Sequence, residues 1–149
     1  MRKLFLMLAL VFIGGYASAQ VVLTANVPKE VREKFDAMYP SASMVMWEKE
    51  GGNYEADFKM ESKSYSAVFE PSGTFVQKEE SIEEASLPTG AKEYLGKNYP
   101  GKKLVECVKI TKADGKIMYE AEVEATETEF TFDESGNYVS QKKEKGIVK

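Results

Sequence analysis

One pattern of residues occurs twice in this chain, and that repetition constrains the fold more than any other feature. An amphipathic stretch that ends in Tyr-Pro begins at Val27-Pro28 and again at Leu87-Pro88. Strand-like runs follow each stretch, and both halves then reach a turn built on a glycine, Gly73 in the first and Gly136 in the second. Matching features in the same order indicate a tandem duplication.

Within each half, the spacing of apolar residues changes from helical to extended. Val31, Phe35 and Met38 recur at i, i+4 and i+7, which predicts a helix that buries one stripe. The run from Tyr54 to Met60 then alternates apolar and charged residues, which is typical of a strand with one buried face. The run from 119 to 125 alternates in the same way. Each repeat is therefore predicted to contain one helix followed by four antiparallel strands.

The predicted fold class is α+β, a tandem repeat of a helix plus a four-stranded antiparallel sheet. A unit of about 60 residues buries too little surface to be stable alone, so we expect one continuous sheet with the helices covering one of its faces. The expected division is a first repeat over 27–86 and a second over 87–144. Residues 20–26 form an N-terminal extension and 145–149 a tail.

The first 19 residues have the features of a signal peptide. Arg2 and Lys3 precede an apolar run from Leu4 to Ile13, and the triplet Ala17-Ser18-Ala19 predicts cleavage after Ala19. A membrane anchor is the alternative, but ten helical residues rise only about 15 Å, against a hydrocarbon core of about 30 Å. We expect a periplasmic or secreted protein without a membrane anchor after cleavage.

Charge and cysteine content limit the possible partners. Loss of the signal peptide moves the net charge from −4 to −6, and Arg32 is the one arginine that remains. Proteins that bind nucleic acid neutralise phosphates and recognise guanine with clustered lysine and arginine residues, which this chain lacks. Nucleic acid is therefore not an expected partner. Cys107 is the single cysteine, which rules out an intramolecular disulfide, and its apolar neighbours favour a buried thiol over a reactive one.

The complete absence of histidine removes most catalytic mechanisms. Serine-type triads, cysteine–histidine dyads and the common zinc sites each lack a required residue. Carboxylates remain as a conceivable acid/base pair of a glycan hydrolase. The sequence predicts no enzyme, no cofactor and no metal site.

Seven acidic residues are expected on the uncovered face of the sheet. They share one alternation along the strands and are Glu55, Asp57, Glu120, Glu122, Glu124, Glu127 and Glu129. Two interpretations remain open. These residues form either a functional surface, which recognises a basic partner or holds cations diffusely, or a solvated face that keeps the protein soluble.

Three large apolar residues precede the first hairpin. Met44, Met46 and Trp47 belong either to the core or, if two of them face outward, to a binding anchor. Trp47 is included in the candidate binding surface together with the acidic residues.

The two halves together resemble a known family. The repeated helix ending in Tyr-Pro, the hairpin from Trp47 to Phe58 and the turns at Gly73 and Gly136 are similar to those of PepSY-like exported proteins of Bacteroidetes. That fold is similar to the beta-lactamase inhibitory protein, in which two helix-plus-sheet units join edge to edge. The resemblance implies a concave surface that binds another protein. Disulfides of the inhibitory protein have no counterpart here, so inhibition of a beta-lactamase is not implied.

The resulting hypothesis is an exported, non-catalytic binding module for a protein or peptide of the cell envelope, possibly inhibitor-like. Recognition would use the open sheet face or the hairpin tips around Gly51-Gly52 and Asp114-Gly115. The alternative is a cation-binding or structural protein of the envelope, and a glycan hydrolase is the third.

Overall fold

The computed structural model describes residues 20–126 and 128–143, so the predicted signal peptide, Glu127 and the predicted tail lie outside the described residues. The first part of the chain contains, in order, β1 (Gln20–Val22), η1 (Thr24–Asn26), α1 (Lys29–Met38), β2 (Ser43–Glu50), β3 (Asn53–Met60), β4 (Lys63–Phe69) and β5 (Phe75–Ser81). The second contains η2 (Glu84–Ser86), α2 (Thr89–Asn98), β6 (Leu104–Lys112), β7 (Ile117–Val123), β8 (Thr128–Asp133) and β9 (Tyr138–Lys143).

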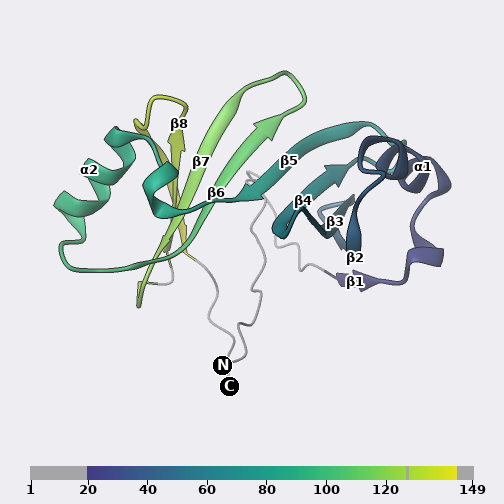
Figure 1. Cartoon of the computed structure of the whole chain (residues 1–149), viewed down its shortest axis with the longest axis horizontal. Coiled ribbons are helices and arrows are strands. Elements are labelled where there is room, and N and C mark those ends of the chain that lie inside the picture. The colour runs from purple at the N-terminus through teal and green to yellow at the C-terminus, as the bar shows by residue number, and fades with distance from the viewer. Residues whose placement is uncertain (1–19, 127, 144–149) are drawn as a thin grey trace.

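The nine described strands form one antiparallel sheet, in which each strand pairs with the next along the chain (Figure 1). This confirms the α+β class and the continuous sheet. The join between the halves is the pairing of β5 with β6. One strand was not expected: residues 20–22 of the N-terminal extension pair with β2 as the edge strand β1.

Each helix begins directly after a proline and ends at a tyrosine. Pro28 and Pro88 occupy the N-cap, where a missing N–H costs nothing. Tyr39 and Tyr99 leave helical geometry at the C-cap, and each still donates its backbone N–H to the carbonyl four residues earlier. The next residue is a proline in both cases, so neither helix continues.

The helix α1 buries an aromatic core against β2, β3 and β4. Its Phe35 lies 5.1 Å from the ring of Phe58 and 5.2 Å from that of Trp47, in edge-to-face geometry. Trp47 is only 3% exposed. The interpretation of Trp47 as part of a binding surface is therefore wrong, because this side chain fills the space between helix and sheet.

The helix α2 covers a core with smaller side chains. Ala91 and Leu95 lie where the first repeat has Val31 and Phe35, and Cys107 takes the place of Trp47. Cys107 is buried, and burial raises the pKa of its thiol to about 12, as expected for a structural thiol.

Both turn glycines position a hairpin against the start of a helix. Gly73 and Gly136 have φ values of +85° and +86°. A Cβ at Gly73 would lie 2.7 Å from the Glu30 carbonyl oxygen, and one at Gly136 would lie 2.7 Å from the Ala91 nitrogen. Glycine is thus required twice over, for its backbone conformation and for the close approach of the helix.

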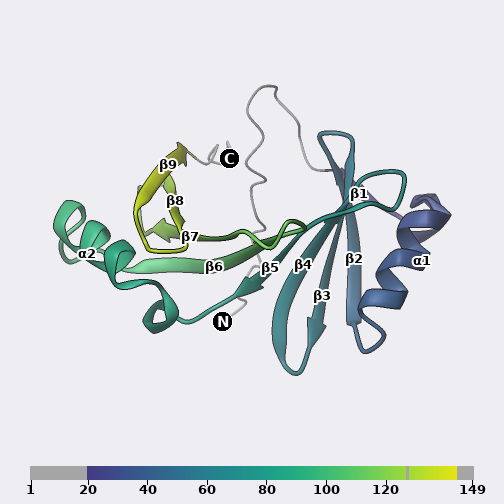
Figure 2. The ribbon, with the colours of Figure 1, turned by 90° about the horizontal axis from the view of Figure 1, so that it is seen from above.

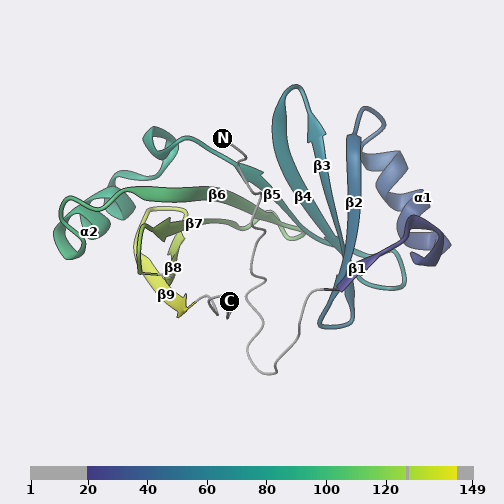
Figure 3. The same cartoon turned by 90° about the horizontal axis from the view of Figure 1, so that it is seen from below.

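Both helices pack on the same face of the sheet. The pairing of β4 with β5 and of β5 with β6 places Ala67, Lys78 and Thr111 in one row, on the side of the helices. We call the opposite side the open face; it carries Glu55, Asp57, Ser66, Gln77, Glu79, Val108, Glu120, Glu122, Glu129 and Thr131. Figures 2 and 3 show that β7, β8 and β9 turn away from the direction of β2, β3 and β4, so the sheet is strongly twisted and curled.

Candidate binding pocket on the open face

Part of the open face is buried, which differs from the interpretation of its acidic residues as a solvated surface. Glu55 and Glu120 are each only 2% exposed, and Glu129 is also buried. The alternation predicted the correct side of the sheet for these residues. It did not predict their burial, which follows from the curl of the sheet and the crowding of long side chains on neighbouring strands.

The remaining acidic candidates are dispersed. Asp57 and Glu122 are half-buried on the open face, whereas Glu124 follows β7 and is exposed. Glu127 lies outside the described residues. The structure therefore brings together five of the seven predicted carboxyl groups on this face: Glu55, Asp57, Glu120, Glu122 and Glu129.

Sequence reasoning missed further buried polar residues of this face, among them Ser66, Gln77 and Glu79. Gln77 donates from Nε2 to Oε1 of Glu79 at 2.6 Å, and Ser66 donates from Oγ to the other oxygen of Glu79 at 3.4 Å. Glu79 is 2% exposed. The alternation of Gln77, Glu79 and Ser81 along β5 was a usable signal, because it places all three on one side of the strand.

Buried oxygens without a hydrogen-bond partner mark this face. They are Oε1 of Glu55, Oδ2 of Asp57 and Oε2 of Glu120. Burial is costly for a carboxylate in this state, so the neutral form is favoured. Burial first and the charge of Asp57 second raise the pKa of Glu55 to about 8.

The neighbouring carboxyls shift in the same direction. Burial, with the charge of Glu48 as a second cause, raises the pKa of Asp57 to about 7. Burial and then the charge of Glu79 raise the pKa of Glu120 to about 7. The pKa of Glu79 itself rises well above its usual range, chiefly through burial and the charge of Glu55. Several of these groups therefore hold a proton at neutral pH.

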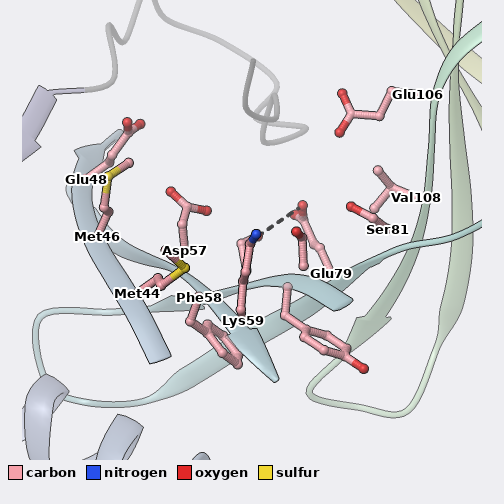
Figure 4. A pocket seen from close by; sticks show the side chains of 13 residues that line it. Met44, Met46, Glu48, Asp57, Phe58, Lys59, Glu79, Ser81, Glu106 and Val108 are labelled. Atoms are coloured by element: carbon pink, nitrogen blue, oxygen red, sulfur yellow. Dashed lines mark hydrogen bonds between the residues drawn. The ribbon is translucent and has the colours of Figure 1, made fainter. Parts of the chain in front are cut away.

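The open face contains a pocket of about 490 Å³ at the first repeat (Figure 4). Its lining comes from five consecutive strands, β2 to β6, and includes Met44, Met46, Glu48, Asp57, Lys59, Ser66, Glu79, Ser81, Glu106 and Val108. At the second repeat, the neighbouring space beside Glu106, Glu120 and Glu129 measures only about 10 Å³. The first repeat therefore provides the room for a ligand.

A bulge in β2 presents two methionines to this pocket. The pairing of β2 with β3 is irregular between Ser43 and Met46, and Met44 has a φ of +54°. Methionine rarely adopts this backbone conformation, and the strain is of the kind that accumulates at functional sites. Met44 is 75% exposed and Met46 54% exposed, so these two methionines face outward and Trp47 does not. Their use as a binding anchor stays a prediction.

The described residues show no group of three or more acidic, cysteine or histidine side chains arranged to hold a metal ion. The buried carboxyls interact with hydroxyl and amide groups and with one another instead. Thr131, for example, donates to Oε1 of Glu120 at 3.4 Å.

A family model matches most of the chain. The model described as "Putative beta-lactamase-inhibitor-like, PepSY-like" matches twice, over residues 17–77 and 53–140. The chain belongs to this PepSY-like family. The resemblance inferred from the repeated helices and turns is confirmed, and so are two PepSY-like repeats. Among curated protein sequences, none matches the chain.

Solved structures from Bacteroides have the same fold. A protein of the DUF2874 family from Bacteroides uniformis is 18% identical with a TM-score of 0.69, and the match covers 77% of this chain and 88% of that one. A "putative periplasmic" protein from Bacteroides eggerthii is 17% identical with a TM-score of 0.69, covering 78% and 88% of the two chains. A protein similar to the beta-lactamase inhibitory protein, from Bacteroides fragilis, is 17% identical with a TM-score of 0.60, covering 77% and 85%. In the part of this chain that the structure describes, no helix is long and apolar enough to cross a membrane.

Proposed function

We propose that this chain is an exported, non-catalytic binding module that recognises a protein or peptide through the pocket on its open face. The observation that carries the proposal is the pocket itself, because it combines about 490 Å³ of space with two exposed methionines and with half-buried and buried carboxyls. Adaptable apolar side chains beside a few fixed polar groups are typical of binding sites.

The fold supports this proposal. The beta-lactamase-inhibitor-like family and the periplasmic description of a structural neighbour both suit an exported protein that binds another. A repeat of one helix and four strands, with each helix buttressing its half of the sheet, would supply a rigid platform for the open face. The chain contains no histidine, so a binding role is also better supported than acid–base or nucleophilic catalysis.

The test is site-specific photo-cross-linking of the full chain, exported in cells that contain the native envelope. A photo-reactive amino acid would replace Met46 in one sample and Met38 in the other. Met38 is the matched control, since it is an exposed methionine on α1, on the far side of the sheet. We expect a discrete cross-linked product from position 46 only. Absence of any product from position 46, or identical products from both positions, would contradict the proposal.

A further inference from the structure

Buried carboxyl groups of both repeats meet at the centre of the open face. Glu79 on β5 lies between them, with Glu55 of β3 on one side and Glu120 of β7 on the other. Burial first and the charge of Glu55 second raise the pKa of Glu79, and the charge of Glu129 adds to this effect. Burial and then the charge of Glu79 raise the pKa of Glu120. Glu79 therefore links the acids of the two repeats electrostatically.

This proximity depends on the curl of the sheet. Glu129 lies on β8, three strands away from β5, and a flat sheet would hold these two strands about 14 Å apart. Figure 2 shows that β8 and β9 bend out of the plane of β5 and β6. The bend turns Glu129 toward Glu79, whose pKa its charge raises. A change in curl would therefore change the distances between these acids.

The packing that fixes the curl is concentrated on the open face. On the helix side, one core lies under α1 and a separate one under α2. At the join, β5 pairs with β6, and a small third core of Val108, Ile110 and Met118 lies on the open face. Ile110 is paired with Glu79, and Val108 with Glu120. Strand ladders tolerate a wide range of twist, so side chains at this join determine the angle between the repeats.

The curled arrangement suits neutral acids and not ionised ones. Oε1 of Glu55 and Oε2 of Glu120 are buried without a hydrogen-bond partner. A protonated carboxyl tolerates such a site, whereas a carboxylate there has lost its hydration without compensation. Ionised neighbours would also repel one another, and the low dielectric of a buried site strengthens that repulsion. Loss of protons therefore favours any arrangement that admits water between the strands.

Lysines of this face offset only part of the charge that ionisation would create. Lys59 places its nitrogen among the acids of the pocket (Figure 4), and Lys142 lowers the pKa of Glu120 against the larger effect of burial. The open-face residues of β4, Ser64, Ser66 and Val68, are uncharged. The ionisable groups that face Glu79 from the other strands are Glu48 on β2, Glu55, Asp57 and Lys59 on β3, Glu106 and Lys112 on β6, Glu120 and Glu122 on β7, Glu129 on β8 and Lys142 on β9.

We propose that one cluster of buried carboxyls is a pH-sensitive switch that sets the angle between the two repeats. This carboxyl cluster consists of Glu55, Glu79, Glu120 and Glu129. When its members are protonated, the sheet keeps its curl. When they ionise, the sheet flattens, water enters the open face, and the edge strands β1 and β9 move apart.

The switch acts on the pocket because both repeats line it. Met44 and Asp57 belong to the first repeat, whereas Glu106 and Val108 belong to the second. Flattening of the sheet moves the second pair away from the first and widens the pocket. Control of ligand binding by the switch rests on the proposed function, whereas the movement itself does not.

The test measures the distance between spin labels on the two edge strands by double electron–electron resonance, in the mature protein without ligand. Val21→Cys on β1 and Val139→Cys on β9 carry the labels, since both side chains are exposed, and Cys107 is buried. The distance should be longer at pH 9 than at pH 6 by at least about 3 Å, the thickness of one layer of water. The midpoint should lie between about 7 and 8, where Glu120 and Glu55 lose their protons.

Glu79→Gln should remove this pH response, because glutamine imitates the protonated acid and cannot ionise. The control Glu80→Gln changes the next residue of β5, which lies on the opposite face and pairs with Lys63, so the response should remain. Glu120→Gln is a second variant with the same expectation as Glu79→Gln. Far-UV circular dichroism establishes that each protein is folded at both pH values.

Three results would overturn the switch. They are equal label distances at pH 6 and pH 9, a pH response that survives both Glu79→Gln and Glu120→Gln, and loss of secondary structure at pH 9 in place of a movement between folded repeats. The cross-linking experiment at position 46 is independent of these measurements. A cross-linked product without a change in label distance rejects the switch and supports the proposed function, and the reverse result supports the switch alone.

Discussion

The two repeats have the same scaffold and different contents, and the difference shows where function can be located. Both helices begin after a proline, end at a tyrosine and lie against a turn glycine. The first repeat has an aromatic core and an open pocket, whereas the second has a core of smaller side chains and a nearly closed open face. Features that occur in both repeats serve the fold, and features that occur in one are candidates for recognition.

The largest expected effect distinguishes the two cores. Phe35 contacts the rings of Tyr39, Trp47, Phe58 and Phe69, so Phe35→Ala should lower the free energy of unfolding by about 4 kcal/mol. Leu95 occupies the same position on α2, and Leu95→Ala should lower the free energy of unfolding by about 3 kcal/mol. Urea denaturation followed by circular dichroism measures both values. A larger loss from Leu95→Ala would reverse the proposed difference between the cores.

The second effect concerns the buried carboxyls and has a defined pH dependence. Glu120 binds its proton more tightly in the folded state (pKa about 7) than in the unfolded chain (4.5), so its contribution to stability is complete below about pH 4.5 and is lost as the pH rises through about 7. Glu120→Gln removes the charge, and should raise the free energy of unfolding by about 2 kcal/mol at pH 8 with little change at pH 4.

Glu124→Gln is the matched control for this substitution, because Glu124 follows the same strand and is exposed. It should change stability by less than about 0.5 kcal/mol at either pH. Thermal unfolding at the two pH values measures both variants. If Glu120→Gln does not raise the free energy of unfolding at pH 8, the carboxyl of Glu120 is ionised there without penalty.

The third effect should be equal in the two repeats. Gly73→Ala and Gly136→Ala combine a strained backbone with a Cβ that meets the helix, whereas Gly115→Ala has the same φ of +85° and open space around it. Gly115→Ala should lower the free energy of unfolding by about 1 kcal/mol. Gly73→Ala and Gly136→Ala should each lower it by about 1 kcal/mol more than Gly115→Ala does. Denaturation midpoints give the comparison. Unequal costs for Gly73 and Gly136 would mean that the helix–turn contact is not a shared element of the scaffold.

The smallest effect on stability should accompany a large effect on binding. Met46→Lys and Met38→Lys both replace an exposed methionine, so each should change the free energy of unfolding by less than about 0.5 kcal/mol. Only Met46→Lys adds a positive charge and removes apolar surface at the pocket. It should prevent cross-linking of the envelope partner to a photo-reactive residue at position 44, whereas Met38→Lys should leave that product unchanged. Binding that survives Met46→Lys and not Met38→Lys would place the ligand elsewhere.

Much of the scaffold could be predicted because local physics determines it. A proline fixes where a helix can begin or stop, helical spacing identifies Val31 and Phe35 as core, and a turn with positive φ demands glycine at positions such as 73. Alternation along β3 and β7 also assigned Glu55 and Glu120 to the correct side of the sheet.

The properties of the site could not be obtained in the same way, because they depend on how distant strands curl toward one another. Alternation states which side of a strand carries Glu55 and says nothing of what lies above that side. The bulge between Ser43 and Met46, at which Met44 has a φ of +54°, is a change of register, and it has no signature in a list of apolar residues. Glu79 was missed as a site residue because its strand was identified by neighbouring turns and not by its own polar face.

The most direct test of the account is a pH titration of the side-chain carboxyl ¹³C signals of the mature protein. The central claim is that the buried acids of the open face, Glu55, Glu79 and Glu120, are held neutral by the side chains packed around them. Glu55 should titrate with a midpoint of about 8, and Glu120 with one of about 7. Midpoints for both near the ordinary glutamate value of 4.5 would show that water reaches this face freely, and would contradict the claim.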